Sequence, residues 1–295
     1  MISVTIATYE RPAYLRRALQ GLLAGTALPA EIVIIDQSKG EETRRVVEEI
    51  GSELVRYARQ APPSLSAARN RAVELARSDY VAIVDDDCEF RPEWLEAVQR
   101  ESERFSYPDA LYGAIHHPDP NGDSRDLGVS IFVPPGPQVW EFPAHPGHMG
   151  YGAHVVLRRS TFFELQGFDE RFGHRGRFRG AEDIDYSYRL LKDGYRAVST
   201  PRVSVIHHQP RAQADLPRYF YGTNRAQAAF CAKHLREGDR YPWRILLEQV
   251  GSDIRMLASG VRRRSAIRAR TGLFRMAGTV VGLAKGWRAF RPDQA

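Results

Sequence analysis

The sequence predicts an α/β fold, a mostly parallel β-sheet flanked by helices, with a helical extension at the C-terminus. Short β-branched, apolar runs alternate with helical segments over about the first 105 residues. These runs are continuous in their apolar character, which is typical of parallel strands that are covered on both faces. After residue 210 the chain has a helical pattern throughout and is rich in arginine.

The first two strand and helix pairs lie within residues 2–50. Residues 2–7 (ISVTIA) are short and β-branched, which predicts a buried strand. A helix opens at Arg11-Pro12 and continues to about residue 23, because proline favours the first helical position and leucines recur on one face. Residues 31–35 (EIVII) predict the second strand, and residues 40–50 the second helix.

Two further pairs follow. Residues 53–58 (ELVRYA) predict the third strand, and residues 64–77 a helix that Ser64 caps. Residues 80–84 (YVAIV) predict the fourth strand, and residues 92–103 a helix that begins at a proline. In a parallel sheet of this kind, ligands bind beyond the carboxyl ends of the strands, so we expect the site there.

The periodicity fails between residues 116 and 149, where proline, glycine and histidine are frequent. A compact domain rarely keeps so long an irregular segment without a use, so it is a candidate lid or binding loop. The last predicted elements are strands at 152–158 and 203–206 and helices at 160–166 and 183–193. We therefore expect a catalytic domain over residues 1–210, with halves at about 1–105 and 106–210, and a helical region over 211–295.

Composition excludes several classes of protein. With 43% hydrophobic and 26% charged residues among 295, the chain is neither disordered nor fibrous. Its two cysteines, Cys88 and Cys231, exclude a disulfide framework and a cysteine-rich zinc module. The N-terminus lacks the pattern of a signal peptide, and no apolar run reaches the roughly 18 residues of a membrane span. We expect a cytoplasmic protein, with peripheral attachment to the inner face of the membrane as an option for the tail.

The basic charge belongs to the tail. Residues 211–295 carry 17 Lys and Arg against 6 Asp and Glu, whereas residues 1–210 carry 25 against 30. Basic residues beside a short apolar stretch with Trp287 and Phe290 favour helices that bind an anionic membrane surface. A homodimer interface or a solvated face would have the same composition, and nucleic acid is not the expected partner.

Three consecutive carboxylates, Asp85, Asp86 and Asp87, follow the fourth predicted strand. Like charges this close repel unless a cation neutralises them, which favours bound Mg²⁺ or Mn²⁺. The alternative is an acidic turn that caps the next helix. A second cluster, Glu182-Asp183-Ile184-Asp185, opens a helix, and His207-His208 ends the last predicted strand. Histidine at a strand end is a candidate Mn²⁺ ligand, although packing is the commoner role.

The order of these motifs resembles the family 2 glycosyltransferases, which have the GT-A fold. The resemblance rests on VTIATYERPAYLRRAL, IVIIDQS, SAARNRAVELARSDYVAIVDDDCEF, GAHVVLRRSTFFELQGFDERFG and GAEDIDYSYRLLKDGYRAVSTPRVSVIHH, and it covers about residues 2–210. It implies an inverting transfer of a sugar from a nucleotide-sugar to a hydroxyl group. Each motif alone is weak, but together and in this order they are specific.

The resemblance assigns roles to individual positions. Asp183 matches the usual catalytic base, and Glu182 a residue that positions the acceptor. The positions that match the binding site of the nucleotide-sugar donor are Thr8, Tyr9, Arg11, Asp36, Arg69, Asp85 and Asp86. The metal ligands are expected at Asp87 and at His207 or His208. Three positions depart from the family pattern, namely Glu10, Gln37 and His154, the last of which would alter the choice of sugar.

UDP- or dTDP-sugars are the expected donors, with Mn²⁺ or Mg²⁺ as cofactor and a glycan, lipid-linked or small-molecule acceptor. Three other functions compete with this one. A sugar nucleotidyltransferase would need a glycine-rich basic loop after the first strand, where the chain has TIATYERP. A phosphatase would need its Asp pair after the first strand rather than the fourth. An inactive nucleotide- or glycan-binding module would bind the nucleotide without turnover.

Overall fold

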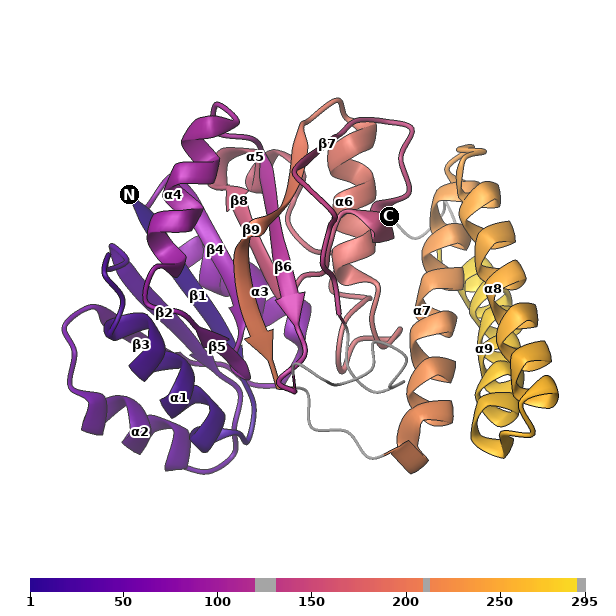
Figure 1. Ribbon diagram of the computed structural model, residues 1–295, viewed down its shortest axis with the longest axis horizontal. Coiled ribbons are helices and arrows are strands. Elements are labelled where there is room, and N and C mark those ends of the chain that lie inside the picture. The colour runs from indigo at the N-terminus through magenta and orange to yellow at the C-terminus, as the bar shows by residue number, and fades with distance from the viewer. Residues whose placement is uncertain (120–130, 209–212, 291–295) are drawn as a thin grey trace. The chain divides into compact units, whose positions relative to one another are not determined.

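The protein is described from a computed structural model that defines residues 1–119, 131–208 and 213–290. The chain forms two units (Figure 1). Residues Met1–Glu170 and Tyr186–Pro210 make the first, and residues Arg171–Asp185 and Arg211–Ala295 make the second. The second unit therefore includes a segment that precedes residue 210, in addition to the tail.

The first unit is built on one β-sheet. Its strand order is β3-β2-β1-β4-β8-β6-β9-β5, and β7 pairs with β9. The strands are β1 (Ile2–Thr8), β2 (Glu31–Asp36), β3 (Val55–Arg59), β4 (Tyr80–Asp85), β5 (Cys88–Phe90), β6 (Ala110–His116), β7 (Gln138–Trp140), β8 (His154–Arg158) and β9 (Ala197–His207). The mixed α/β class and the helix-flanked sheet are confirmed.

The parallel part of the sheet matches the prediction. β1 pairs in parallel with β2 and β4, and β2 with β3. The connections carry α1 (Pro12–Leu23), α2 (Glu42–Ile50) and α3 (Leu65–Leu75). The Ser64 side chain accepts a hydrogen bond from the N–H of Ala67 at 3.4 Å, so the predicted cap of α3 is present. Right-handed connections of this kind bring the carboxyl ends of β1, β2 and β4 to one edge of the sheet.

The other half of the sheet is mixed. β8 is antiparallel to β4 and β6, β9 is parallel to β6, and β5 is antiparallel to β9. The sequence did not predict β5, β6 or β7, and it began the last strand at residue 203, where the structure begins β9 at Ala197. β5 and β7 have only three residues each, too few for a periodic pattern to appear. The expected irregular segment 116–149 contains β7 and a short 3₁₀ turn, η1 (Pro146–His148), and residues 120–130 of it lie outside the described part.

Helices cover both faces of the sheet (Figure 1). On one face, α1 and α4 (Trp94–Arg104) pack on a buried apolar cluster that includes Ile6, Ile34 and Val84. On the other face, α3, α5 (Arg159–Glu164) and the last part of α6 (Glu182–Lys192) pack on the apolar side chains of the sheet, which form two adjacent clusters there. Each buried Ile or Val contributes about 1.5–3 kcal/mol to folding, so the two cores fix the strand register that positions the site.

The second unit contains α7 (Leu216–Arg236), α8 (Pro242–Arg262) and α9 (Ala266–Ala289), preceded by η2 (Gln213–Asp215). The prediction of a wholly helical tail is confirmed for residues 213–290. A buried polar network links the three helices. The Asp253 carboxylate accepts hydrogen bonds from Asn224 Nδ2 at 2.9 Å, Arg275 Nε at 2.7 Å and Thr279 Oγ1 at 3.0 Å. Each member has a partner, so the network specifies one arrangement of the helices.

Candidate active site

The carboxyl ends of three parallel strands place the predicted donor residues side by side. In the sheet register Thr8 pairs with Asp36 and Ala7 with Asp85. Asp86 and Asp87 form the turn that leads from β4 into β5. Since β5 is antiparallel to β9, with Cys88 opposite His207, the turn lies beside the end of β9. Residues far apart in the sequence therefore meet at one edge of the sheet.

Asp86 is held within the protein. It is 4% exposed, and its carboxylate accepts hydrogen bonds from Thr8 Oγ1 at 2.7 Å and Arg11 Nη1 at 3.1 Å. Burial raises the pKa of Asp86 to about 7, although Arg11 and the Thr8 hydroxyl both lower it. With its oxygens engaged in this way, Asp86 orients Arg11 and the loop after β1.

Asp87 and His207 form a buried pair of a carboxylate and an imidazole at this edge. His207 Nε2 lies 2.8 Å from Asp87 Oδ1 and 3.7 Å from Asp85 Oδ2. Among the described residues, the other ring nitrogen of His207, Nδ1, has no hydrogen-bond partner. Arg11 Nη1 donates to the other oxygen of Asp87 at 2.9 Å. A buried carboxylate oxygen and an imidazole nitrogen this close together are a fitting donor set for a divalent cation.

The electrostatics of this pair also favour a cation. Burial lowers the pKa of His207, but the carboxylates of Asp87 and Asp85 raise it by more. Conversely, burial raises the pKa of Asp87, but His207 and Arg11 lower it by more. The pocket therefore stabilises one additional positive charge, either a proton on His207 or a metal ion in its place.

Cys88 and His208 lie near the Asp87–His207 pair but are not placed to bind a metal with it. Cys88 lies within reach of Asp87 and His207, but its thiol donates to the carbonyl of Ala153 at 3.6 Å. Burial raises the pKa of Cys88 well above its usual value, so the thiolate that a metal would need is disfavoured. His208 is turned elsewhere, with Nε2 2.9 Å from Glu89 Oε2. Of the two predicted histidines, the structure brings His207 to Asp87.

Asp36 is fully buried and its carboxylate is oriented by two donors. The N–H of Ser38 donates to Oδ1 at 2.8 Å and the Tyr57 hydroxyl donates to Oδ2 at 2.7 Å. Burial and this carboxylate raise the pKa of Tyr57, which keeps its hydroxyl protonated as a donor. The sequence did not single out Tyr57 or Ser38. A tyrosine on the neighbouring strand β3 was the available signal, since β3 ends beside β2.

Arg69 reaches the same edge from the first turns of α3. Its Nη2 donates to Asp85 Oδ1 at 2.7 Å, and its side chain is 4% exposed. The guanidinium also lies over the ring of Phe168, 5.9 Å from the ring centre. A buried arginine stacked on an aromatic ring is held in one orientation, so Arg69 fixes Asp85 at the rim of the site.

The departures from the family pattern have structural explanations. Glu10 has a left-handed backbone (φ 56°), and its N–H donates to Ser38 Oγ at 2.8 Å. Gln37 Oε1 accepts from the N–H of Ser64 at 2.6 Å, which ties the loop after β2 to the start of α3. His154 is 1% exposed, accepts from Trp94 Nε1 at 3.0 Å and lies 3.2 Å from the carbonyl of Ala114. The ring of His154 is enclosed in the core, and its effect on the choice of sugar stays a prediction.

The predicted base lies in the other unit. Glu182 and Asp183 occupy the first turn of α6, where carboxylates complement the helix dipole. Two residues on, the fully buried Asp185 pairs with Lys233 Nζ at 2.7 Å and His234 Nε2 at 2.9 Å, both from α7. This buried ion pair fixes the first turn of α6 to α7, and with it the backbone that carries Asp183.

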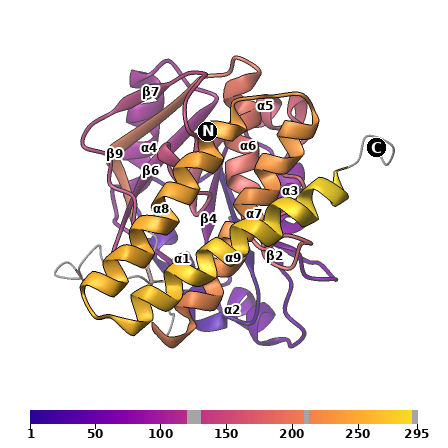
Figure 2. The same cartoon turned by 90° about the vertical axis from the view of Figure 1, so that its right-hand side faces the viewer.

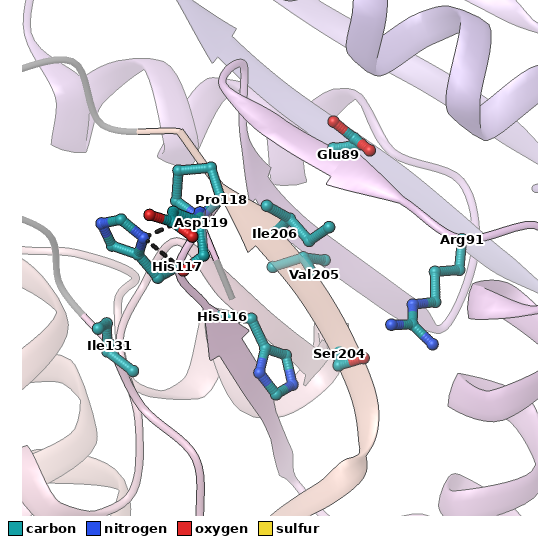
Figure 3. Close-up of a pocket in the computed structure, with 10 residues that line it drawn as sticks. All are labelled: Glu89, Arg91, His116, His117, Pro118, Asp119, Ile131, Ser204, Val205 and Ile206. Atoms are coloured by element: carbon teal, nitrogen blue, oxygen red, sulfur yellow. Dashed lines mark hydrogen bonds between the residues drawn. The ribbon is translucent and has the colours of Figure 1, made fainter. Parts of the chain in front are cut away.

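A pocket of about 420 Å³ lies along the first unit's sheet, beside β5, β6 and β9 (Figure 3). The ring of His116 and the guanidinium of Arg91 lie on either side of Ser204. Glu89 is two residues from Asp87, and Ile206 directly precedes His207, so the pocket and the pair share two strands. The other lining residues are His117, Pro118, Asp119, Ile131 and Val205.

Comparison with known proteins adds the family relationship. Residues 3–163 match the model of the family described as "Glycosyl transferase family 2". The chain is 28% identical over 216 residues to the glucosyl-dolichyl phosphate glucuronosyltransferase of Haloferax volcanii, which covers 70% of this chain and 68% of the relative. It is 28% identical over 227 residues to the O-antigen biosynthesis protein RfbC of Myxococcus xanthus, but it spans only 17% of that longer protein.

Solved structures share the fold. The mannosyltransferase PcManGT from Pyrobaculum calidifontis, determined in complex with GDP-Man and Mn²⁺, superposes with a TM-score of 0.66 at 17% identity. The alignment covers 96% of this chain and 87% of that structure. At this level of identity the similarity defines the fold alone.

Proposed function

Because this chain belongs to glycosyl transferase family 2, we propose that it transfers a sugar from a nucleotide-sugar donor to an acceptor hydroxyl in a single inverting displacement. The observation that carries the proposal is the edge of the sheet where Asp85, Asp86 and Asp87 meet Arg11, Arg69 and His207. The fold is that of the GT-A glycosyltransferases. Carboxylate and guanidinium groups that lie together at strand ends can bind a cation and a diphosphate, respectively. Charged groups of this kind are not expected in a packed core.

The donor's nucleotide is assigned to the loops after β1 and β2. Thr8, Tyr9 and Asp36 belong to this region, and Asp36, whose carboxylate Ser38 and Tyr57 hold in place, would bind the nucleoside. Asp85 is the exposed member of the acidic run and is assigned to the ribose, with Arg69 holding it in place. Arg11, with a side chain 46% exposed, is placed to approach the diphosphate. UDP- and dTDP-sugars remain the favoured donors.

Asp87 and His207 would hold a divalent metal, Mn²⁺ or Mg²⁺, since one carboxylate and one imidazole leave room for phosphate oxygens. When bound, the metal would neutralise the charge that develops on the departing diphosphate. Arg11 would share that task through its guanidinium. Asp183 would take the proton of the acceptor hydroxyl as its oxygen attacks the anomeric carbon, with Glu182 positioning the acceptor.

The pocket beside β5, β6 and β9 is assigned to the acceptor. Its guanidinium, carboxylate and imidazole groups can donate to and accept from sugar hydroxyls. The names of two relatives contain glucosyl-dolichyl phosphate and O-antigen biosynthesis. These names support a glycan or lipid-linked acceptor and a role in cell-envelope glycan biosynthesis.

Calorimetric titration with UDP, dTDP, GDP and CDP, each with Mn²⁺ and with EDTA, tests the donor site. We expect one nucleotide to bind only with the metal, and Asp87→Asn to weaken that binding at least about tenfold. Asp79→Asn is the matched control, because this exposed residue precedes the opposite end of the same strand. Tight nucleotide binding that is unchanged by EDTA would contradict the proposed metal site. If no nucleotide binds, the proposed donor site is wrong.

Asp183→Asn tests the chemical step. We expect it to keep the wild-type nucleotide affinity and to lose transfer by about 10²–10⁴-fold, the usual contribution of a general base. Asp193→Asn, just after the other end of α6, is the control and should transfer normally. Equal transfer by Asp183→Asn and wild type would remove Asp183 from the role of base. Release of pyrophosphate from a nucleoside triphosphate and a sugar 1-phosphate would instead identify a nucleotidyltransferase.

A further inference from the structure

Helices α8 and α9 carry large apolar side chains on their outward faces. On α8 these are Trp243, Leu247, Ile254 and Val261, which are 52–68% exposed. On α9 they are Leu273, Met276, Val280 and Trp287, which are 36–68% exposed. The spacings of three, four and seven residues place each set on one side of its helix. We call these two sets together the outer apolar face.

The contact between α9 and α7 explains why the large apolar side chains of α9 lie on its outward side. A Cβ on Gly278 or Gly282 of α9 would lie 2.5 or 2.2 Å from a carbonyl oxygen of α7, so only glycine permits this approach. Small residues thus occupy the side of α9 that contacts α7, and the large apolar residues occupy the opposite side. A helix that faces water normally has the reverse pattern, so the outer apolar face is a candidate binding surface.

Positive charge borders this face. Arg244, Arg255, Arg262 and Arg288 each directly follow a member of the outer apolar face, and all four are exposed. Residues 242–289 contain ten Lys and Arg against two acidic residues, Glu248 and Asp253, and Asp253 is buried against Arg275. Among the described residues of α8 and α9, Glu248 is therefore the one exposed carboxylate.

α8 and α9 lie on the same side of α7, so their outward faces form one continuous surface (Figure 2). α8 and α9 are joined by the short turn near Arg264, and both lie in front of α7 in Figure 2. The view in Figure 1 agrees, with α8 and α9 on the same side of α7. None of the described helices is long and apolar enough to cross a bilayer. A bilayer could therefore meet this surface only along its plane.

We propose that the outer apolar face and its arginine border bind the surface of a membrane that contains anionic lipid. Tryptophan, leucine and valine side chains enter the boundary between head groups and acyl chains, and the arginines pair with anionic head groups. A second copy of the chain is disfavoured as the occupant, since a symmetric interface would bring two arginine rows of like charge together. This binding needs neither donor nor metal, so it can be tested apart from the transfer reaction.

Sedimentation of the full chain with vesicles provides the test. We expect binding to vesicles of equal parts phosphatidylglycerol and phosphatidylcholine, weak binding to phosphatidylcholine alone, and release by high salt. The double variant Leu247→Glu, Val280→Glu alters two residues that are each 68% exposed, so its folding should be unchanged. It should lower the partition coefficient at least about tenfold. Leu28→Glu, at an exposed leucine of the first unit, is the matched control and should bind normally.

A second variant tests the charge separately. Arg255→Gln with Arg262→Gln should weaken binding to anionic vesicles and reduce its dependence on salt, with circular dichroism confirming an unchanged fold. The proposal is overturned if wild type does not bind anionic vesicles, or if the Leu247→Glu, Val280→Glu variant binds as wild type does. Analytical ultracentrifugation showing a dimer that the same double variant dissociates would assign the face to a second copy and would also overturn the proposal.

Discussion

Replacing Gly282 by alanine is expected to weaken the packing of α9 on α7. The added Cβ would lie 2.2 Å from the carbonyl oxygen of Arg225 and 2.9 Å from the Cβ of Ala228. The oxygen belongs to the backbone of a helix, so it cannot turn away as a side chain would. The helices must separate by roughly 1 Å to reach van der Waals contact, and overpacking of this kind costs about 1–3 kcal/mol. Alanine regains up to about 1 kcal/mol through helix propensity, so we expect a net loss of about 1–2 kcal/mol.

The same substitution in α8 should have the opposite sign. A Cβ on Gly251 would meet only the end of the flexible Arg255 side chain, at 3.3 Å. Gly251→Ala should therefore raise the free energy of unfolding by up to about 1 kcal/mol. Urea unfolding of both variants, followed by circular dichroism, measures the two changes. Stabilisation by Gly282→Ala, or equal effects of the two substitutions, would refute the close approach of α7 and α9.

Three further perturbations test other parts of the molecule. Lys233→Met should leave the carboxylate of Asp185 short of a partner and lower the free energy of unfolding by about 3 kcal/mol, and an unchanged urea midpoint would contradict this. Burial lowers the pKa of His154 to about 4, so the unfolded chain takes up its proton first as pH falls. Stability should therefore decrease from about pH 6.5 to pH 4 by up to about 3 kcal/mol, and His154→Gln should flatten that part of the measured pH profile. Tyr57→Phe removes a donor to Asp36 and should weaken nucleotide binding about fivefold by calorimetry, whereas unchanged affinity would exclude a positioning role.

Local sequence patterns were sufficient for the parallel half of the sheet. Residues 2–7, 31–35 and 80–84 are continuous β-branched runs, and each became a strand within a residue or two of the predicted bounds. Proline at the start of a helix and the Ser64 cap marked helix starts, because these effects depend on neighbours along the chain. The same patterns missed β5 and β7, which exist only because β9 offers each of them an edge.

Some residues of the candidate site could likewise be predicted from the sequence, whereas others could be assigned only from the structure. The sequence identified Asp87 and His207 because each follows an apolar strand, and a parallel sheet gathers strand ends at one edge. It left His207 and His208 as alternatives, with a slight preference for His207. The choice between them depends on the side of β9 to which each points, and on Glu89, which pairs with His208.

The sequence by itself determined the fold class, the family and the residue types at the strand ends, because these follow from local periodicity and from motifs in a fixed order. Tertiary structure decided what each of those residues contacts. Asp86 is buried against Thr8, His154 is enclosed in the core, and Asp185 is paired with α7. It also turned the large apolar side chains of α9 outward, because glycines in α9 allow α7 to approach too closely for them to face inward. Burial and pairing are properties of the packed chain, since they depend on residues that are distant in sequence and adjacent only after folding.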